Sequence, residues 1–250
     1  MRPDLPLKGV KGCLLSLATG VISTLVGLLL SNISKFAFPL VMTIAIYPIY
    51  YLDLRQGRSW EASKHVLLWA LSSSITLILL TALLGEGIGE LILHGTSYKQ
   101  EMLDWIKTGK GPEGDPRLFI VPKLREIAIF SVLCLFSAGF LGLFLGSFLL
   151  NYMNYYVGCI IIHARPGKLW VPLIFGWPIY AILRVVGYVN LGIVLSVPIF
   201  SKILKVEFDE RQVKRQLYLA ILTIALDFIL KGTVANLVYQ PLLRGAIELG

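Results

Sequence analysis

Long apolar runs, separated by short polar segments, dominate the pattern of hydrophobic and polar positions along this chain. A helix needs about 20 apolar residues to cross ~30 Å of hydrocarbon, and backbone that faces lipid must satisfy its own hydrogen bonds. The chain is therefore predicted to be an all-α, polytopic transmembrane helical bundle of about seven spans, with a range of about six to eight. The predicted spans cover residues 10–31, 36–52, 65–93, 127–150, 169–186, 188–204 and 216–238.

Three of these runs have irregular features. The run at 36–52 is short and carries two prolines, which favours a kinked or re-entrant helix, and the run at 65–93 is long enough to tilt or project. Residues 127–163 form a nearly unbroken apolar stretch, too long for one span and short for two. We interpret it as one span ending near Asn151, followed by an interfacial or cytoplasmic helix over 151–163.

The segment 95–126 is the one substantial polar connection in the pattern. Tyr98, Met102, Trp105 and Ile106 fall near helical spacing. This spacing predicts a short amphipathic helix lying on the outer surface of the membrane.

Composition supports a membrane location for the whole chain, 1–250, as a single integral-membrane domain. The sequence is 56% hydrophobic and only 15% charged, whereas soluble domains carry about 25% charged residues. A water-soluble fold of this size could not enclose so much apolar surface. The lipid bilayer is therefore the expected partner of most of the surface.

The net charge of +8 arises from 23 basic and 15 acidic residues. No nucleic-acid-binding motif accompanies it, so the basic residues are interpreted as loops facing anionic lipid. The positive-inside rule predicts a cell (inner) membrane protein with a cytoplasmic N-terminus and an outside C-terminus. The residues assigned to the cytoplasm include Arg2, Lys8, Lys11, Arg55, Arg58, Lys64, Arg165, Lys168 and the basic residues of 202–215.

The segment GEGIGELILH follows the third apolar run. If the helix continues, Glu86, Glu90 and His94 share one face, because they are spaced four residues apart. Two carboxylates and an imidazole on one face could bind a divalent metal or pass protons. The alternative is that these residues are solvated at the outer end of the helix.

Charged residues also occur inside the later apolar runs. Asp227 and Lys231 are one helical turn apart, and Arg184 lies near the outer end of its run. Since a charge within the bilayer is costly, such residues mark functional sites or pair with each other. Arg184 could instead extend to the headgroups. The pathway hypothesis places Glu86, Glu90, Arg184, Asp227 and Lys231 around one polar vestibule in the outer half of the membrane.

Ala138, Gly142 and Gly146 recur every four residues in the fourth predicted span. Small residues at this spacing allow close helix packing. The stripe is therefore predicted to be structural.

These features favour a transporter or channel for an ion or small solute. The first alternative is a non-catalytic subunit or assembly factor of a larger membrane complex, or a homo-oligomer, because small-residue and aromatic positions also suit helix docking. The second alternative is a membrane-embedded, metal-dependent enzyme acting on lipid through Glu86, Glu90 and His94. Hydrolase, nucleotide-binding and zinc-protease motifs do not occur, so an enzyme is less favoured, and no cofactor is indicated.

Overall fold

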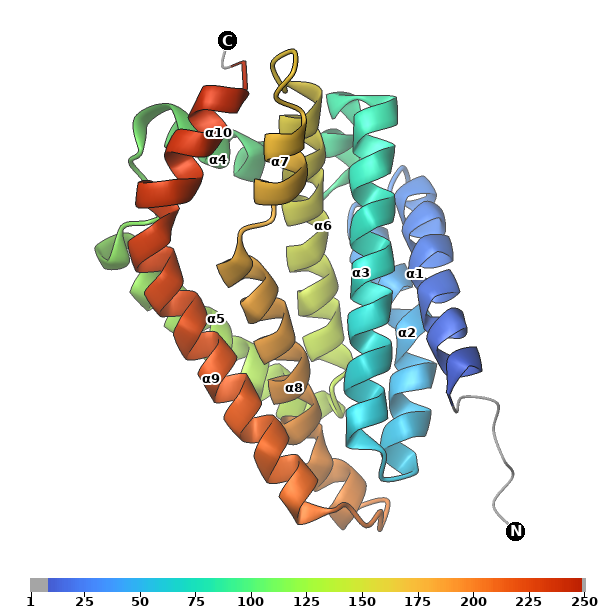
Figure 1. The fold of residues 1–250 in the computed structure, drawn as a ribbon. Helices are drawn as coiled ribbons and strands as arrows, with labels where there is room; N and C mark the ends of the chain where they lie inside the picture. The colour runs from blue at the N-terminus through green and yellow to red at the C-terminus, as the bar shows by residue number, and fades with distance from the viewer. Residues whose placement is uncertain (1–8, 249–250) are drawn as a thin grey trace.

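Long helices packed side by side form the body of the protein in the computed structural model, which describes residues 9–248 (Figure 1). The long helices are α1 (Val10–Leu30), α2 (Ala37–Arg55), α3 (Ser59–Leu84), α5 (Pro116–Ser137), α6 (Phe140–Ile162), α8 (Ile179–Lys202) and α9 (Glu210–Val234). The short elements are the 3₁₀ helix η1 (Glu86–Leu91), α4 (Gly95–Thr108), α7 (Trp170–Phe175), the π-helix η2 (Ala235–Tyr239) and α10 (Gln240–Ala246).

The all-α, polytopic prediction is confirmed. Six segments of the described chain are long and apolar enough to cross a membrane, and they cover 10–30, 37–55, 59–84, 140–162, 170–202 and 210–246. The remaining long helix, α5, carries several charged residues. The predicted amphipathic helix is also present as α4, and it buries Met102, Trp105 and Ile106.

The two ends of the bundle differ. The end that carries η1, α4, α7 and α10 is called the cap (Figure 1, top). The opposite end, called the base, holds the turn at Gly57, which lies against Glu207 in the loop before α9. Both the α2–α3 and α8–α9 connections therefore lie at the base.

A tight turn at Ala138–Gly139 divides the fourth predicted span. Both residues have left-handed backbone conformations, with φ of 51° and 85°, and the Gly139 N–H donates to Cys134 O at 3.1 Å. The chain reverses here, so α5 and α6 form an antiparallel hairpin. The prediction of a span over 127–150 followed by an interfacial helix over 151–163 is wrong, because Phe140–Ile162 is one continuous helix.

The stripe of small residues is divided by the same turn. Ala138 lies in the turn, while a Cβ on Gly142 would fall 2.1 Å from Cys134 Sγ. A Cβ on Gly146 would meet nothing within 4 Å. Of the three residues, Gly142 therefore brings α5 and α6 together, and Gly146 faces open space.

This difference leads to a matched pair of substitutions. Gly142→Ala is expected to lower the free energy of unfolding by about 1–3 kcal/mol, because the added methyl group overpacks the hairpin. Gly146→Ala is expected to be neutral or stabilising by up to about 1 kcal/mol, since alanine favours the helix. Unfolding in detergent micelles measures both variants, and equal losses of stability would contradict this assignment.

The predicted break at residue 187, between the spans 169–186 and 188–204, does not occur, because one helix, α8, covers residues 179–202. α8 starts after Pro178 and runs through residue 187 without a break. Gly187 remains helical because its missing side chain admits α9: a Cβ there would lie 2.7 Å from Ile224 Cγ1. The break in this region falls earlier, at 176–178, between α7 and α8.

The third apolar run also ends earlier than predicted. α3 stops at Leu84, and Gly85, with φ of 85°, turns the chain into η1. With ψ of 178° as well, Gly85 has a backbone conformation that essentially only glycine adopts, which lets it end the helix here.

The sequence-based topology puts Arg165 and Lys168 in the cytoplasm and the C-terminus outside. This part of the prediction is wrong, because both lie at the same end of the bundle. The Arg165 N–H donates to Ala246 O at 2.8 Å, and Lys168 Nζ donates to Gly245 O, also at 2.8 Å. The 163–169 connection therefore lies at the cap beside α10. Arg2 and Lys8 lie outside the described residues, and a cytoplasmic base remains a prediction.

Candidate functional site

Asp227 is the centre of a buried cluster of charges. α9 places this side chain, which is 1% exposed, between α5 and α8. Arg184 of α8 donates to its carboxylate from Nε at 3.2 Å and from Nη2 at 3.5 Å. Lys123 of α5 forms an ion pair with the same carboxylate. One carboxylate therefore joins two cations from two other helices.

A second ion pair lies one turn further along α9 towards the cap. Lys231 Nζ is 2.7 Å from Glu113 Oε2, in the connection between α4 and α5. Burial opposes ionisation of Glu113, but Lys231 and Arg184 outweigh it, so its pKa lies below the ordinary value. The ring of Phe119 packs between the two pairs, 5.1 Å from Lys231 Nζ and 5.8 Å from Lys123 Nζ.

We call Glu113, Lys123, Arg184, Asp227 and Lys231 the charge network. Lys231 and Glu113 balance each other, whereas Lys123 and Arg184 share the single charge of Asp227. Glu126 borders the network, but its carboxylate accepts a hydrogen bond from Tyr188 at 2.6 Å and lines a groove on the outer side of α5 and α6. In the central part of the network two cations contact one carboxylate directly, while Glu113 and Glu126 act on Arg184 from further away.

Two internal cavities meet at Arg184. The larger, about 70 Å³, lies among α2, α3, α5, α6 and α8 and is lined mainly by apolar side chains. The smaller, about 20 Å³, lies towards the cap and is lined by Glu113, Tyr98, Tyr156 and Trp177, among others. Arg184 lines both cavities, together with Met153 and Ala181. Arg184 therefore lies where an apolar cavity and a more polar one come together.

The smaller cavity contains polar atoms that lack partners. The Tyr156 hydroxyl and Trp177 Nε1 are buried and have no hydrogen-bond partner within 9–248. Buried polar groups are normally paired. These two groups are therefore available to a solute or to water at the cap side of Arg184.

The sequence prediction placed Arg184, Asp227 and Lys231 together, and the structure brings all three into the charge network. The predicted alternative of a local Asp227–Lys231 pair is not formed, because each residue pairs with a different element. Glu86 and Glu90 lie elsewhere. Glu90 is exposed and 3.8 Å from Lys35 Nζ, so it does not line either cavity.

Glu86 belongs to a separate contact at the cap. Its carboxylate accepts from Lys99 Nζ at 2.9 Å and lies 2.7 Å from His163 Nε2. Burial alone would raise the pKa of Glu86. The hydrogen bonds and charge interactions with Lys99 and His163 outweigh this effect, so the pKa lies below the ordinary value. This arrangement ties α4 and the end of α6 to η1.

The predicted metal site of Glu86, Glu90 and His94 lacks the required geometry. Because α3 ends at Leu84, the three residues do not share a helix face, and His94 Nδ1 lies 2.7 Å from Ser97 Oγ. Throughout residues 9–248, no three His, Cys, Asp or Glu side chains are grouped as a metal site requires.

Sequence reasoning missed Lys123 and Glu113 because it assigned both to an outer loop. A signal was present in the pair Asp115–Pro116. Asp115 caps α5 by accepting from the Arg117 N–H at 3.0 Å, and Pro116 occupies the first turn. Asp followed by Pro is a typical helix start. A helix beginning there would have included Lys123.

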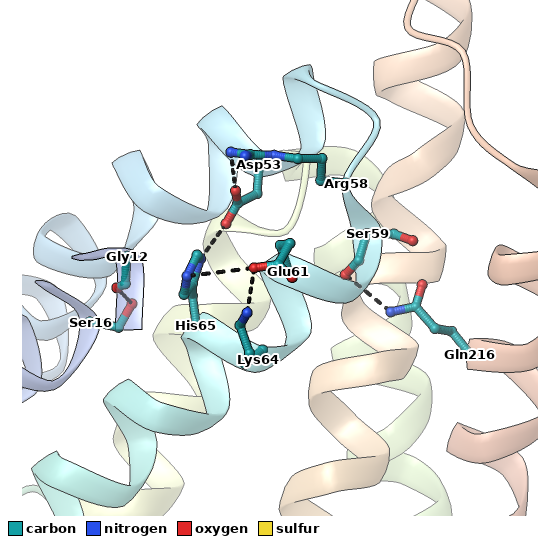
Figure 2. Close-up of polar contacts among 9 residues, drawn as sticks. All are labelled: Gly12, Ser16, Asp53, Arg58, Ser59, Glu61, Lys64, His65 and Gln216. Carbon is teal, nitrogen blue, oxygen red and sulfur yellow. Dashed lines mark hydrogen bonds and ion pairs between the residues drawn. The ribbon is translucent and has the colours of Figure 1, made fainter. Parts of the chain in front are cut away.

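A second buried polar cluster lies at the base (Figure 2). Asp53 of α2 is fully buried; it accepts from Arg58 Nη2 at 2.6 Å, and its other oxygen lies 2.6 Å from His65 Nδ1 of α3. His65 Nε2 and Glu61 Oε2 are 4.0 Å apart. This cluster fixes the short α2–α3 connection, and sequence reasoning did not identify it because Asp53 and His65 are separated by that turn.

Figure 2 also shows how the start of α3 is joined to α9. In this view Gln216 Nε2 donates to Ser59 O at 3.1 Å. Outside the view, Gln216 Nε2 also donates to Asn190 Oδ1 at 3.4 Å. Ser63 Oγ donates to the same Asn190 oxygen at 3.1 Å. Hydrogen bonds therefore connect α3, α8 and α9 near the base, whereas ion pairs connect α5, α8 and α9 nearer the cap.

The apolar helices and the buried charges together define a polytopic α-helical membrane protein. Comparison of the chain with protein-family models, with curated proteins and with solved structures finds no match. The functional argument therefore depends on the geometry of the charge network and the cavities.

Proposed function

We propose that this protein is a membrane transporter that carries a small anionic solute through the bundle, past Arg184. The observation that carries this proposal is the position of Arg184, which lines both internal cavities while Asp227 holds its guanidinium. A solute moving between the cavities would pass this side chain.

The energetic cost of the charge network supports a functional role. Charges within a membrane protein are rare, face the interior and mark solute or ion pathways. Well-packed apolar residues would often stabilise a buried region as well as an ion pair does. Guanidinium groups recognise carboxylates and other oxyanions through fixed, paired donors, which favours an anion as the solute.

The helices around the network contain points at which they can bend. The chain is non-helical between α7 and α8, directly before the helix that carries Arg184. Pro198 lies inside α8, and the π-helix η2 follows α9. Prolines and π-turns are common causes of helix kinks. Movement of α8 and α9 at these points would open Arg184 to each side in turn.

Flux into liposomes containing the purified protein tests the proposal. The panel comprises chloride, nitrate, phosphate, sulfate and acetate, each followed as tracer uptake. We expect Arg184→Gln to reduce uptake of the transported anion at least tenfold, because the variant lacks the charge that attracts it. The matched control is Lys214→Gln, which removes an exposed cation paired with Glu210 at 3.5 Å and should keep wild-type uptake.

Two outcomes would overturn the proposal. Equal uptake by Arg184→Gln and the wild type would show that the path avoids Arg184. Absence of uptake by folded wild-type protein for every anion would favour a non-catalytic subunit of a membrane complex.

A further inference from the structure

We infer that the solute is a short-chain monocarboxylate, whose carboxylate binds Arg184 and whose apolar tail of about two to four carbons occupies the larger cavity. This inference rests on the proposed function for its role in transport, but binding itself can be measured separately.

The charge of the network favours a monoanion. Lys123 and Arg184 together carry two positive charges, and Asp227 supplies one negative charge between them. Glu113 and Glu126 attract Arg184 from further away, so a ligand with one negative charge disturbs this balance less than a divalent anion does. Nε and Nη2 of Arg184 bond Asp227, which leaves Nη1 as the nitrogen for a first contact with a ligand.

The network also provides a way to bind and release the ligand. If the carboxylate of the ligand replaces that of Asp227 on Arg184, Asp227 retains its ion pair with Lys123. Each carboxylate then has one cation, and no buried charge is left without a partner during the exchange. No covalent step is required.

The larger cavity suits an apolar tail. Next to Arg184 its walls include Met153, Val185 and Val189, and the far end is formed by Gly139, Gly142 and Gly192. Its volume of about 70 Å³ is roughly half that of the 150 Å³ apolar cavity known to accept benzene. The tail that fits is therefore smaller than a benzene ring.

The tyrosines in this cavity do not change its apolar character. The Tyr50 hydroxyl donates to Ser196 Oγ at 2.7 Å, and the Tyr188 hydroxyl donates to Glu126 at 2.6 Å. Both hydroxyl protons are therefore engaged away from the cavity. A polar tail, or a second charge on the ligand, would lose its water without gaining a donor.

Calorimetric titration of the full chain in nanodiscs tests the inference, with formate, acetate, propionate, butyrate, octanoate, chloride and sulfate as ligands. Each added methylene up to butyrate should tighten binding by about fourfold, as expected for burial of an apolar group. Octanoate, chloride and sulfate should bind at least tenfold more weakly than butyrate. Affinity that does not depend on chain length, or sulfate binding as tightly as butyrate, would overturn the inference.

Two variants separate the tail site from the charge site. Gly146→Leu places a side chain in the cavity, where a Cβ meets nothing within 4 Å, so the protein should fold. It should weaken butyrate binding at least tenfold and change formate binding less than twofold. Arg184→Gln should weaken both ligands at least tenfold. Unchanged butyrate binding by Gly146→Leu would place the tail elsewhere and refute the assignment.

The results distinguish this inference from the proposed function. Chain-length-dependent binding without liposome uptake would refute transport and keep the ligand assignment. Uptake of inorganic anions without carboxylate binding would refute the ligand assignment and keep transport.

Discussion

Replacing Asp227 by alanine is expected to lower the free energy of unfolding by about 3–5 kcal/mol, which is the loss typical of breaking a buried ion pair from one side. The substitution leaves Lys123 and Arg184 buried, close together and without their shared counter-ion. Unfolding by a denaturing detergent in mixed micelles, followed by circular dichroism, measures the loss.

The control for this prediction is Glu210→Ala in the same helix. Glu210 is exposed, and its pair with Lys214 spans one turn of the surface, so its removal should cost at most about 0.5 kcal/mol. A combined variant, Asp227→Leu with Lys123→Met and Arg184→Met, should recover most of the lost stability while abolishing uptake. A loss below about 1 kcal/mol for Asp227→Ala would show that water reaches the two cations.

Replacing Asp53 by alanine is expected to have the second largest effect, a loss of about 3 kcal/mol. Asp53 is the only carboxylate within hydrogen-bond distance of both Arg58 and His65 among residues 9–248, and without it a guanidinium and an imidazole lose their acceptor in a buried site. Because this cluster closes the α2–α3 turn, the ends of both helices should exchange amide hydrogens faster. Hydrogen exchange with mass spectrometry over residues 50–66 measures this local opening.

Lys64→Ala is the matched control for the base cluster. Lys64 pairs with Glu61 at 2.5 Å on the partly exposed face of the same turn, and surface pairs of this kind contribute about 0–1 kcal/mol. Asp53→Asn should fall between the two, since its amide oxygen can still accept from Arg58. Equal exchange rates in Asp53→Ala and Lys64→Ala would mean that the cluster does not fix the turn.

Hydrophobic patterning was sufficient to predict the class of fold but not the position of every turn. The apolar runs locate α1 and α2 closely, because lipid contact requires apolar side chains on those helices throughout. Patterning cannot show a reversal that contains no polar residue, which is why the Ala138–Gly139 turn was missed. It also cannot show that Gly187 allows close packing instead of ending a helix.

The members of the candidate site that could be predicted are those whose charge contrasts with an apolar run. Arg184, Asp227 and Lys231 stand out because charge is rare in apolar runs. Glu113 does not stand out because its segment is polar, and Lys123 does not because Arg125 and Glu126 follow it closely. Only the packing of α5 against α8 and α9 buries the two side chains. Glu86, Glu90 and His94 appeared related only while α3 was assumed to continue past Gly85.

The turn between α5 and α6 has a consequence for how the hairpin lies in the membrane. Two of its N–H groups and its hydroxyl group are bonded locally: Gly139 N–H donates to Cys134 O, and Ser137 Oγ accepts from the Leu141 N–H. The neighbouring Phe136 is apolar and 82% exposed. The tip of this hairpin therefore combines an apolar exposed side chain with N–H and hydroxyl groups that are already bonded. The tip can thus stay in contact with lipid, and only the open end of the hairpin, at the cap, has polar connections that need water.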